Sequence, residues 1–185
     1  MKKIMFNDKY GLTDAVLQGH KTMTRRTVGN RMTDDDIKAY LKGYSELADK
    51  AAHYKIGEVV AVAQSYSSFR PLISHNDDYS PSHPGWNNKM FVRADLMPHQ
   101  IRITDIKVER LQDISDEDCL KEGVYMRTEQ HPRQEFEPEY TFGEGKYHAQ
   151  NPIAAFAALI DDVSGKGTWE RNPFVFAYSF ELVNL

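Results

Sequence analysis

Every second residue between Phe174 and Leu182 is large and apolar, and this alternation constrains the fold of the 185-residue chain more than any other feature. Successive side chains of a β-strand point to opposite faces of a sheet, so a period of two places all of these residues on one face. The alternating positions are Phe174, Phe176, Tyr178, Phe180 and Leu182. The pattern predicts a strand whose aromatic face packs on a hydrophobic core.

Other segments are expected to supply the rest of a sheet. Residues 59–64 form a nearly continuous apolar run, which is typical of a buried strand. Residues 101–111 predict a longer strand, and their apolar positions change face near Thr104 and Asp105, which indicates a β-bulge or a bend. We expect two short strands at residues 4–6 and 90–93.

Four segments have the start and stop signals of helices. A short helix is expected from the N-cap Thr13 to the stop Gly19, because glycine tolerates positive φ. Residues 33–52 carry apolar side chains at helical spacing and predict one long helix. Residues 115–122 open with a capping box and precede Gly123, and residues 151–164 open with Asn-Pro.

The order of these elements predicts the fold class. Dispersed strands with helices between them favour an α+β domain, which we interpret as a small mixed or antiparallel β-barrel flanked by helices. Two polar stretches, near residues 65–89 and 126–150, are interpreted as insertions. Residues 1–185 are otherwise expected to form a single domain.

The net charge and the cysteine content restrict which partners and which cellular compartment are expected. The net charge of −4 and the pI near 6.0 argue against sequence-independent coating of nucleic acid, but they leave room for a local basic cleft. Cys119 is the single cysteine, so no intrachain disulfide forms and a reducing, cytoplasmic location is expected. No segment approaches the ~20 apolar residues of a membrane helix.

Residues 19–26 read GHKTMTRR and follow the expected helix stop directly. They resemble the G-x-K-x-x-T-x-R signature of ASCH domains, a family of PUA-like β-barrels. The likeness continues through YKIGEVV at residues 54–60, VERLQDIS at residues 108–115 and Glu122-Gly123. Trp169 and residues 172–176 are similar to the closing strand of phage and prophage-borne members.

The resemblance implies a polar cleft that binds RNA or a modified nucleoside. In the amidohydrolase members, which deacylate N4-acetylcytidine, the working residues are the Lys and Thr of the signature and a later Glu. These correspond to Lys21, Thr24 and Glu122. Other members are reported as nucleases or are presumed to bind RNA. A binding domain and an amidohydrolase are therefore the leading hypotheses, with a nuclease third.

Hydrolysis of an amide would give these residues defined roles. Thr24 would be the nucleophile, Lys21 its base if its pKa is lowered, and Glu122 a proton shuttle. Residues three apart share a face in a turn but not in a strand, so the hydrolase hypothesis predicts a turn at residues 21–24. The structural alternative is also open, because Lys and Arg after a helix stop often satisfy its last carbonyls.

Other residues are candidates for ligand contact. The full set of these candidates is Gly19, Arg25, Arg26, Gln64 and Tyr66. Gln64 and Tyr66 end the buried strand. Two interpretations stay open there: a simple strand exit, or side chains that reach a base edge or stack on the base. His75, His83 and His99 match no metal-ligand spacing, so neither a metal nor a cofactor is expected. Trp86 is interpreted as a loop anchor and Cys119 as a small buried apolar residue, and protein partners stay open.

Overall fold

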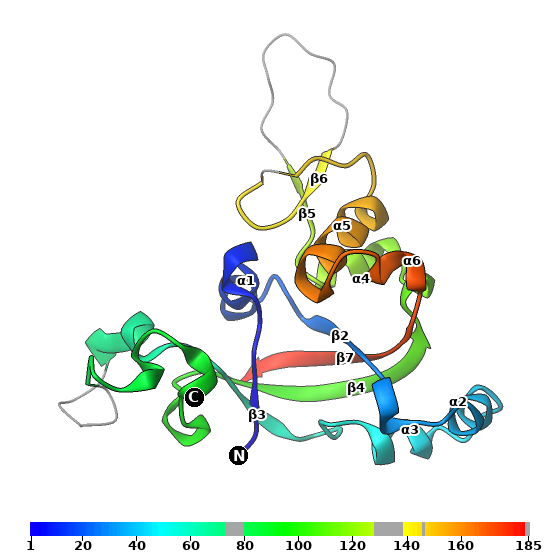
Figure 1. The fold of residues 1–185 in the computed structure, drawn as a ribbon, viewed down its shortest axis with the longest axis horizontal. Coiled ribbons are helices and arrows are strands. Elements are labelled where there is room, and N and C mark those ends of the chain that lie inside the picture. The colour runs from blue at the N-terminus through cyan, green and yellow to red at the C-terminus, as the bar shows by residue number, and fades with distance from the viewer. Residues whose placement is uncertain (73–79, 128–138, 146, 184–185) are drawn as a thin grey trace, which may run out of the picture.

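The computed structural model describes residues 1–72, 80–127, 139–145 and 147–183. Its centre is a five-stranded mixed sheet in the order β1-β3-β4-β7-β2 (Figure 1). β1 pairs with β3 in parallel, and the other neighbours are antiparallel. The strands are β1 (Lys3–Ile4), β2 (Met23–Thr27), β3 (Val59–Val62), β4 (Gln100–Arg110) and β7 (Phe174–Val183).

The helices are distributed around this sheet. In Figure 1, α4, α5 and α6 lie together on one side, next to the small β5-β6 hairpin, and α2 and α3 lie on the other side. The remaining elements are α1 (Leu12–Leu17), α2 (Asp34–Leu41), α3 (Glu46–Ala51), α4 (Asp116–Lys121), β5 (Tyr125–Arg127), β6 (Glu139–Thr141), α5 (Pro152–Ser164) and α6 (Thr168–Arg171). This arrangement confirms the α+β class.

The two longest strands have the predicted form. β7 pairs with β4 on one side and β2 on the other, so the alternating aromatic residues occupy the middle of the sheet. The register of β4 against β7 shifts between Ile103 and Asp105, which confirms the expected β-bulge. Phe176, Tyr178 and Phe180 are buried in the main hydrophobic core.

The predicted closed barrel is wrong for the described residues. The ladders leave β1 and β2 as the two edges of the sheet, and no ladder joins these two strands in the described ranges. A side chain spans part of the seam instead, since the Arg26 guanidinium donates to the carbonyl oxygen of Met5 at 2.6 Å. Side chains from both edge strands, β1 and β2, line a cavity.

Four local predictions need correction. The single helix over residues 33–52 is two helices, because Gly43 adopts φ 108° between them. The N-cap of α1 is Gly11 rather than Thr13, which lies buried inside the helix. The strand expected at residues 4–6 is shorter, ending at Ile4. No strand forms at residues 90–93, where a 3-10 turn (Lys89–Phe91) is capped by Asn88.

The first insertion has its own small core. Tyr66, Phe69, Val92 and Met97 pack with Ala61 and Ala63 around β3, separately from the main cluster. Two lysines attach this region to the N-terminal segment: Lys3 donates to the carbonyls of Met90 and Val92, each at 2.7 Å. Lys89 Nζ donates to the Asp8 carboxylate at 2.6 Å. Residues 73–79, within this insertion, lie outside the described residues, as do residues 128–138 of the second.

Candidate functional site

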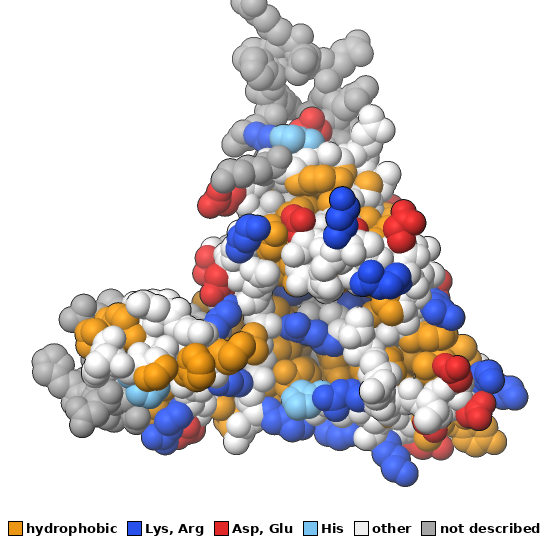
Figure 2. Space-filling model, viewed as in Figure 1, with side chains coloured by type: hydrophobic (Ala, Val, Ile, Leu, Met, Phe, Trp, Pro, Cys, Tyr) orange, Lys and Arg blue, Asp and Glu red, His pale blue; other side chains and the backbone are white. Residues whose placement is uncertain are grey.

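A cavity of about 1170 Å³ opens along the seam between the two edges of the sheet. Its lining comes from the segment after β1, from β2 and β7, from residues 53–54 and from α5. Figure 2 shows this region as a hollow with lysine and arginine side chains gathered around it. Eight Lys or Arg residues line the cavity against two acidic residues, Asp8 and Glu122. The cations are Lys3, Lys9, Lys21, Arg25, Arg26, Arg31, Lys89 and Arg171.

The stop of α1 places Lys21 at this cavity. Gly19 turns the chain with φ 75°, and the amides of His20 and Lys21 both donate to the carbonyl of Ala15. The next amide, of Thr22, donates to the carbonyl of Lys121 at 2.9 Å, which joins the segment to α4. The Lys21 side chain then runs inward and is only 2% exposed.

Lys21 and Glu122 form a buried ion pair. Lys21 Nζ lies 2.6 Å from a carboxylate oxygen of Glu122 and 2.7 Å from its carbonyl oxygen. Burial lowers the pKa of Lys21, although the Glu122 charge opposes that effect, and the positive charges of Arg26 and Arg25 lower it further. A lysine in this setting donates strong hydrogen bonds and releases a proton more readily than an exposed one.

Glu122 is held at the end of α4 by a glycine. It is the C-cap residue of that helix, and Gly123 follows with φ 102°. A Cβ on Gly123 would lie 3.2 Å from the Leu12 side chain and 3.7 Å from Lys21 Cδ. The Glu122-Gly123 pair of the sequence therefore makes room for the lysine stem.

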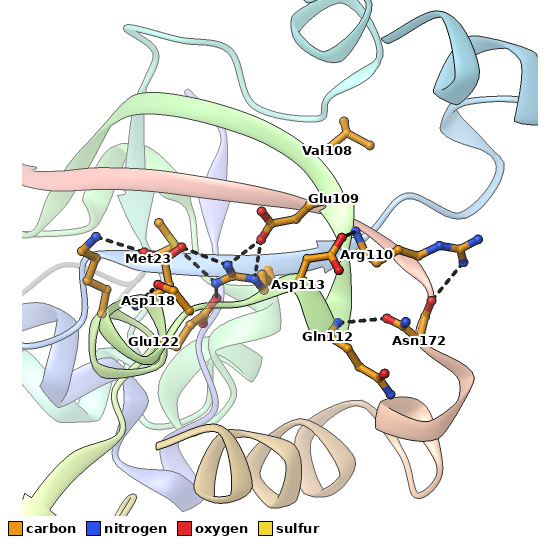
Figure 3. A network of polar contacts seen from close by, with 12 residues as sticks. Met23, Val108, Glu109, Arg110, Gln112, Asp113, Asp118, Glu122 and Asn172 are labelled. Carbon is orange, nitrogen blue, oxygen red and sulfur yellow. Dashed lines mark hydrogen bonds and ion pairs between the residues drawn. The ribbon is translucent and has the colours of Figure 1, made fainter. Parts of the chain in front are cut away.

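Arg25 belongs to a charge network rather than to the open part of the cavity. Its Nη1 lies 3.2 Å from Glu122 Oε1, its Nε 3.0 Å from Glu109 and its Nη2 3.1 Å from Asp118. Figure 3 shows Glu109 from β4 and Asp118 and Glu122 from α4 pointing toward one another beside β2. The side chain is 1% exposed and its donors are engaged by the three carboxylates, although Arg25 lines the cavity. Its direct contact with a ligand stays a prediction.

Thr24 and Arg26 lie on the cavity side of β2. Thr24 pairs with Tyr178 and is buried, and it lines the same cavity as Lys21 and Glu122. The turn predicted at residues 21–24 ends earlier than expected, because β2 begins at Met23. Lys21 precedes that strand, so the rule of opposite faces does not separate it from Thr24.

One aromatic ring connects the two signature cations. Lys21 Nζ lies 5.9 Å and Arg26 Cζ 6.0 Å from the centre of the Phe6 ring. Both distances fall within the range of cation–π contact. Phe6 follows β1, so the N-terminal edge strand supplies a wall of the site that the sequence did not point to.

Several predicted residues lie elsewhere. Tyr66 is fully buried in the core of the first insertion, where its hydroxyl accepts from the Arg93 amide at 3.0 Å, so its ring offers no face to a base. Among the described residues, Gln64 is buried with no hydrogen-bond partner for its side-chain oxygen, and neither Gln64 nor Gly19 belongs to the cavity lining. Cys119 is buried, and burial raises the pKa of its thiol to about 12, which makes it unreactive.

The structure adds residues that sequence reasoning missed. Glu109 and Asp118 complete the network around Arg25, and Arg31, His53 and Tyr178 line the cavity. The alternation of β7 signalled Tyr178, but only as core. In the described part of the chain no group of three or more metal-ligating side chains occurs. His75 lies outside the described residues.

Comparisons with known proteins give limited information. No protein-family model matches the chain, and no curated protein matches it. Among solved structures, the crystal structure of protein EF3133 from Enterococcus faecalis V583, of the family DUF984, is similar with a TM-score of 0.41 and 12% sequence identity. That match covers 99% of this chain and 77% of the other. Within the described residues, no helix has the length and apolar character needed to span a bilayer.

Proposed function

We propose that this chain is an ASCH-type domain that binds RNA or a modified nucleoside in the cavity between its edge strands. The observation that carries the proposal is that Lys21, Thr24 and Arg26, the side chains of the signature, line one cavity together with Glu122. These residues come from β2, the segment before it and the end of α4. Polar side chains that are distant in the sequence but lie together at one cavity are typical of a functional site.

The charge of the cavity supports an anionic or strongly polar ligand. Lysines and arginines dominate its lining, although the whole chain carries a net charge of −4. A positively charged cleft concentrates the positive electrostatic potential within itself, even in a protein whose net charge is negative. Such a cleft attracts a negatively charged ligand that is small enough to enter it. Base recognition would use the Thr24 hydroxyl and the buried Lys21, and Phe6 supplies apolar surface.

A second candidate function is hydrolysis of an N4-acylated cytidine. The lowered pKa of Lys21 and its 2.6 Å contact with Glu122 favour it. In that reaction the proton shared by Lys21 and Glu122 first lies on the carboxyl, which leaves Lys21 as a neutral amine. Thr24 Oγ1 attacks the acyl carbon while this amine takes the hydroxyl proton. Glu122 passes its own proton to the departing amine, which leaves as cytidine, and water then hydrolyses the threonine ester to release the carboxylate and restore the hydroxyl.

One experiment tests both functions. Binding of N4-acetylcytidine and cytidine is measured by calorimetry, and release of cytidine is followed by chromatography, for the wild type, Thr24→Val and Lys21→Met. Arg102→Gln serves as a charge control, because Arg102 lies on β4 outside the cavity and pairs with the exposed Glu181.

The outcomes separate the candidates. Binding without turnover, weakened in Thr24→Val and Lys21→Met but not in Arg102→Gln, supports the binding domain. Turnover that disappears in both cavity variants supports the hydrolase. If the folded wild type binds neither nucleoside, and an unstructured ribo-oligonucleotide does not bind either, the proposed function is wrong.

A further inference from the structure

The charges on the cavity wall divide into two groups. Both acidic residues of the lining already have cations: Glu122 contacts Lys21 and Arg25, and Asp8 contacts Lys89. We name Lys21, Arg25 and Glu122, together with Glu109 and Asp118 behind them, the paired wall. The wall holds two cations and three carboxylates, and Lys121 also pairs with Asp118, so it presents little net field to a ligand.

Arg26, Arg31 and His53 form the other group, named the open wall. All three side chains are exposed, and in the described ranges neither arginine has an ion pair with a carboxylate. Arg26 donates only to the carbonyl of Met5, and its guanidinium lies beside the Phe6 ring. An anion that enters this part of the cavity would be attracted by both guanidinium groups.

The open-wall side chains converge. Arg26, Arg31 and His53 line one cavity together with Tyr54 and Tyr178. The His53 ring packs edge-on against Tyr54, with centroids 4.6 Å apart, and its backbone amide donates to the Tyr178 hydroxyl. The Arg31 charge also reaches His53 and contributes to its lowered pKa, after the larger effect of burial.

Most other cations of the lining have local partners. Lys3 donates to two carbonyls, Arg171 donates to the Thr168 hydroxyl at 2.8 Å, and Lys9 lies over the Tyr10 ring at 5.0 Å. The open wall is therefore the part of the lining where guanidinium donors remain available. Guanidinium groups match the oxygens of a phosphate in a two-pronged geometry, and the N–H of a neutral imidazole adds a further donor.

We propose that Arg26, Arg31 and His53 form a phosphate-binding subsite, so that the cavity takes a nucleotide rather than a bare nucleoside. This inference rests on the proposed function and names the ligand class of the same site. Phe6 separates the two ends, with Lys21 and Arg26 each within 6.0 Å of its ring centre. The base lies toward Lys21 and Thr24 in this arrangement, and the phosphate lies toward Arg31.

The phosphate has two sources, a terminal monoester or an internal diester of RNA. Calorimetry at fixed ionic strength is carried out with cytidine and N4-acetylcytidine, each as the nucleoside and as the 5′-monophosphate, and with a cytidine trinucleotide. The proteins are the wild type, Arg31→Gln and the matched control Arg102→Gln. A mononucleotide that binds best indicates a monoester, and a trinucleotide that binds best indicates a diester.

The expected result is that the phosphate strengthens binding roughly tenfold or more, as a charge-assisted hydrogen-bonded pair does. Arg31→Gln should bring the ratio of nucleotide affinity to nucleoside affinity close to one, whereas Arg102→Gln should keep the ratio of the wild type. Equal affinity for nucleoside and nucleotide, or equal loss in the two arginine variants, would overturn the subsite while the binding function stands.

A second readout does not depend on any nucleoside. Inorganic phosphate is titrated while the His53 imidazole signal is followed by NMR in the wild type and Arg31→Gln. A saturable shift in the wild type that is lost in Arg31→Gln supports the subsite even if no nucleoside binds. Absence of a shift in the wild type rules it out.

Discussion

Arg25 and Arg26 are neighbours in β2, yet the strand gives them opposite environments. The Arg25 side chain is 1% exposed and reaches three carboxylates, whereas Arg26 is exposed and lies on the open wall. Successive residues of a strand face opposite ways, so Arg25 turns to the buried carboxylates of the paired wall and Arg26 turns to the open wall. Position in the strand, and not residue type, therefore decides which arginine is structural and which is available to a ligand.

The same contrast extends to the two walls of the cavity. The paired wall buries its charges and satisfies them, which fixes the positions of Lys21 and Glu122. The open wall leaves its guanidinium groups near water and near one another. A site needs both kinds of wall, because preorganised donors orient a ligand and unpaired charge attracts it.

The largest expected effect comes from matched substitutions in β2. Arg25→Met leaves Glu109, Asp118 and Glu122 without their shared cation, and removing one partner of a buried ion pair costs roughly 3–5 kcal/mol of unfolding free energy. Arg26→Met removes the bond to the Met5 carbonyl and the contact with the Phe6 ring, both at an exposed side chain, and should cost about 1 kcal/mol. Urea unfolding followed by circular dichroism measures both. Equal losses in the two variants would contradict the division of the walls.

A smaller effect tests whether the paired wall acts as a unit. Lys21→Met leaves Glu122 with Arg25 alone, and Glu122→Gln leaves the buried ammonium without a carboxylate. Each single change should lower the unfolding free energy by about 2–3 kcal/mol, because the remaining charge keeps one hydrogen-bond partner. The double variant should lose less than the sum, with a coupling of roughly 1–3 kcal/mol for residues in contact. Additive losses would mean that the 2.6 Å contact contributes nothing of its own.

The long elements were predictable from the sequence because one local pattern specifies each of them. The alternation of β7, the apolar run of β3 and the phase change of β4 each reflect which face is buried. Lys21, Thr24 and Glu122 were found through the resemblance, and the structure places them at one cavity. The local sequence also predicted the helix stops at Gly19 and Gly123. These two turns set the directions in which Lys21 and Glu122 leave the backbone.

Features that depend on distant contacts were not predictable in the same way. Tyr66 looked available to a ligand, but Val92 and Met97, far along the chain, bury it. Gly43 adopts positive φ and divides a segment whose apolar spacing suggested one helix. The open wall combines Arg26, Arg31 and His53, which share no motif and meet only when the edge strands are brought together.

The smallest effect concerns the open wall and is read from His53. Burial lowers the pKa of His53 below its ordinary value of 6.5, and the charges of Arg31 and Lys2 lower it further while Glu58 opposes them. Arg31→Gln should therefore raise this pKa toward the ordinary value, without restoring it fully because burial persists. NMR titration of the imidazole measures the change, and Arg102→Gln should leave it unaltered.

The lowered pKa of His53 also sets the direction in which the unfolding free energy changes with pH. Between the lowered pKa of His53 and 6.5 the unfolded chain binds more protons at this residue than the folded chain. The contribution of His53 to stability therefore rises with pH across that window and is lost as the pH falls through it. Arg31→Gln should narrow the window, since it removes part of the shift. An unchanged His53 pKa in Arg31→Gln would mean that the Arg31 charge does not reach the imidazole, and the open wall would then lose the convergence on which a phosphate subsite depends.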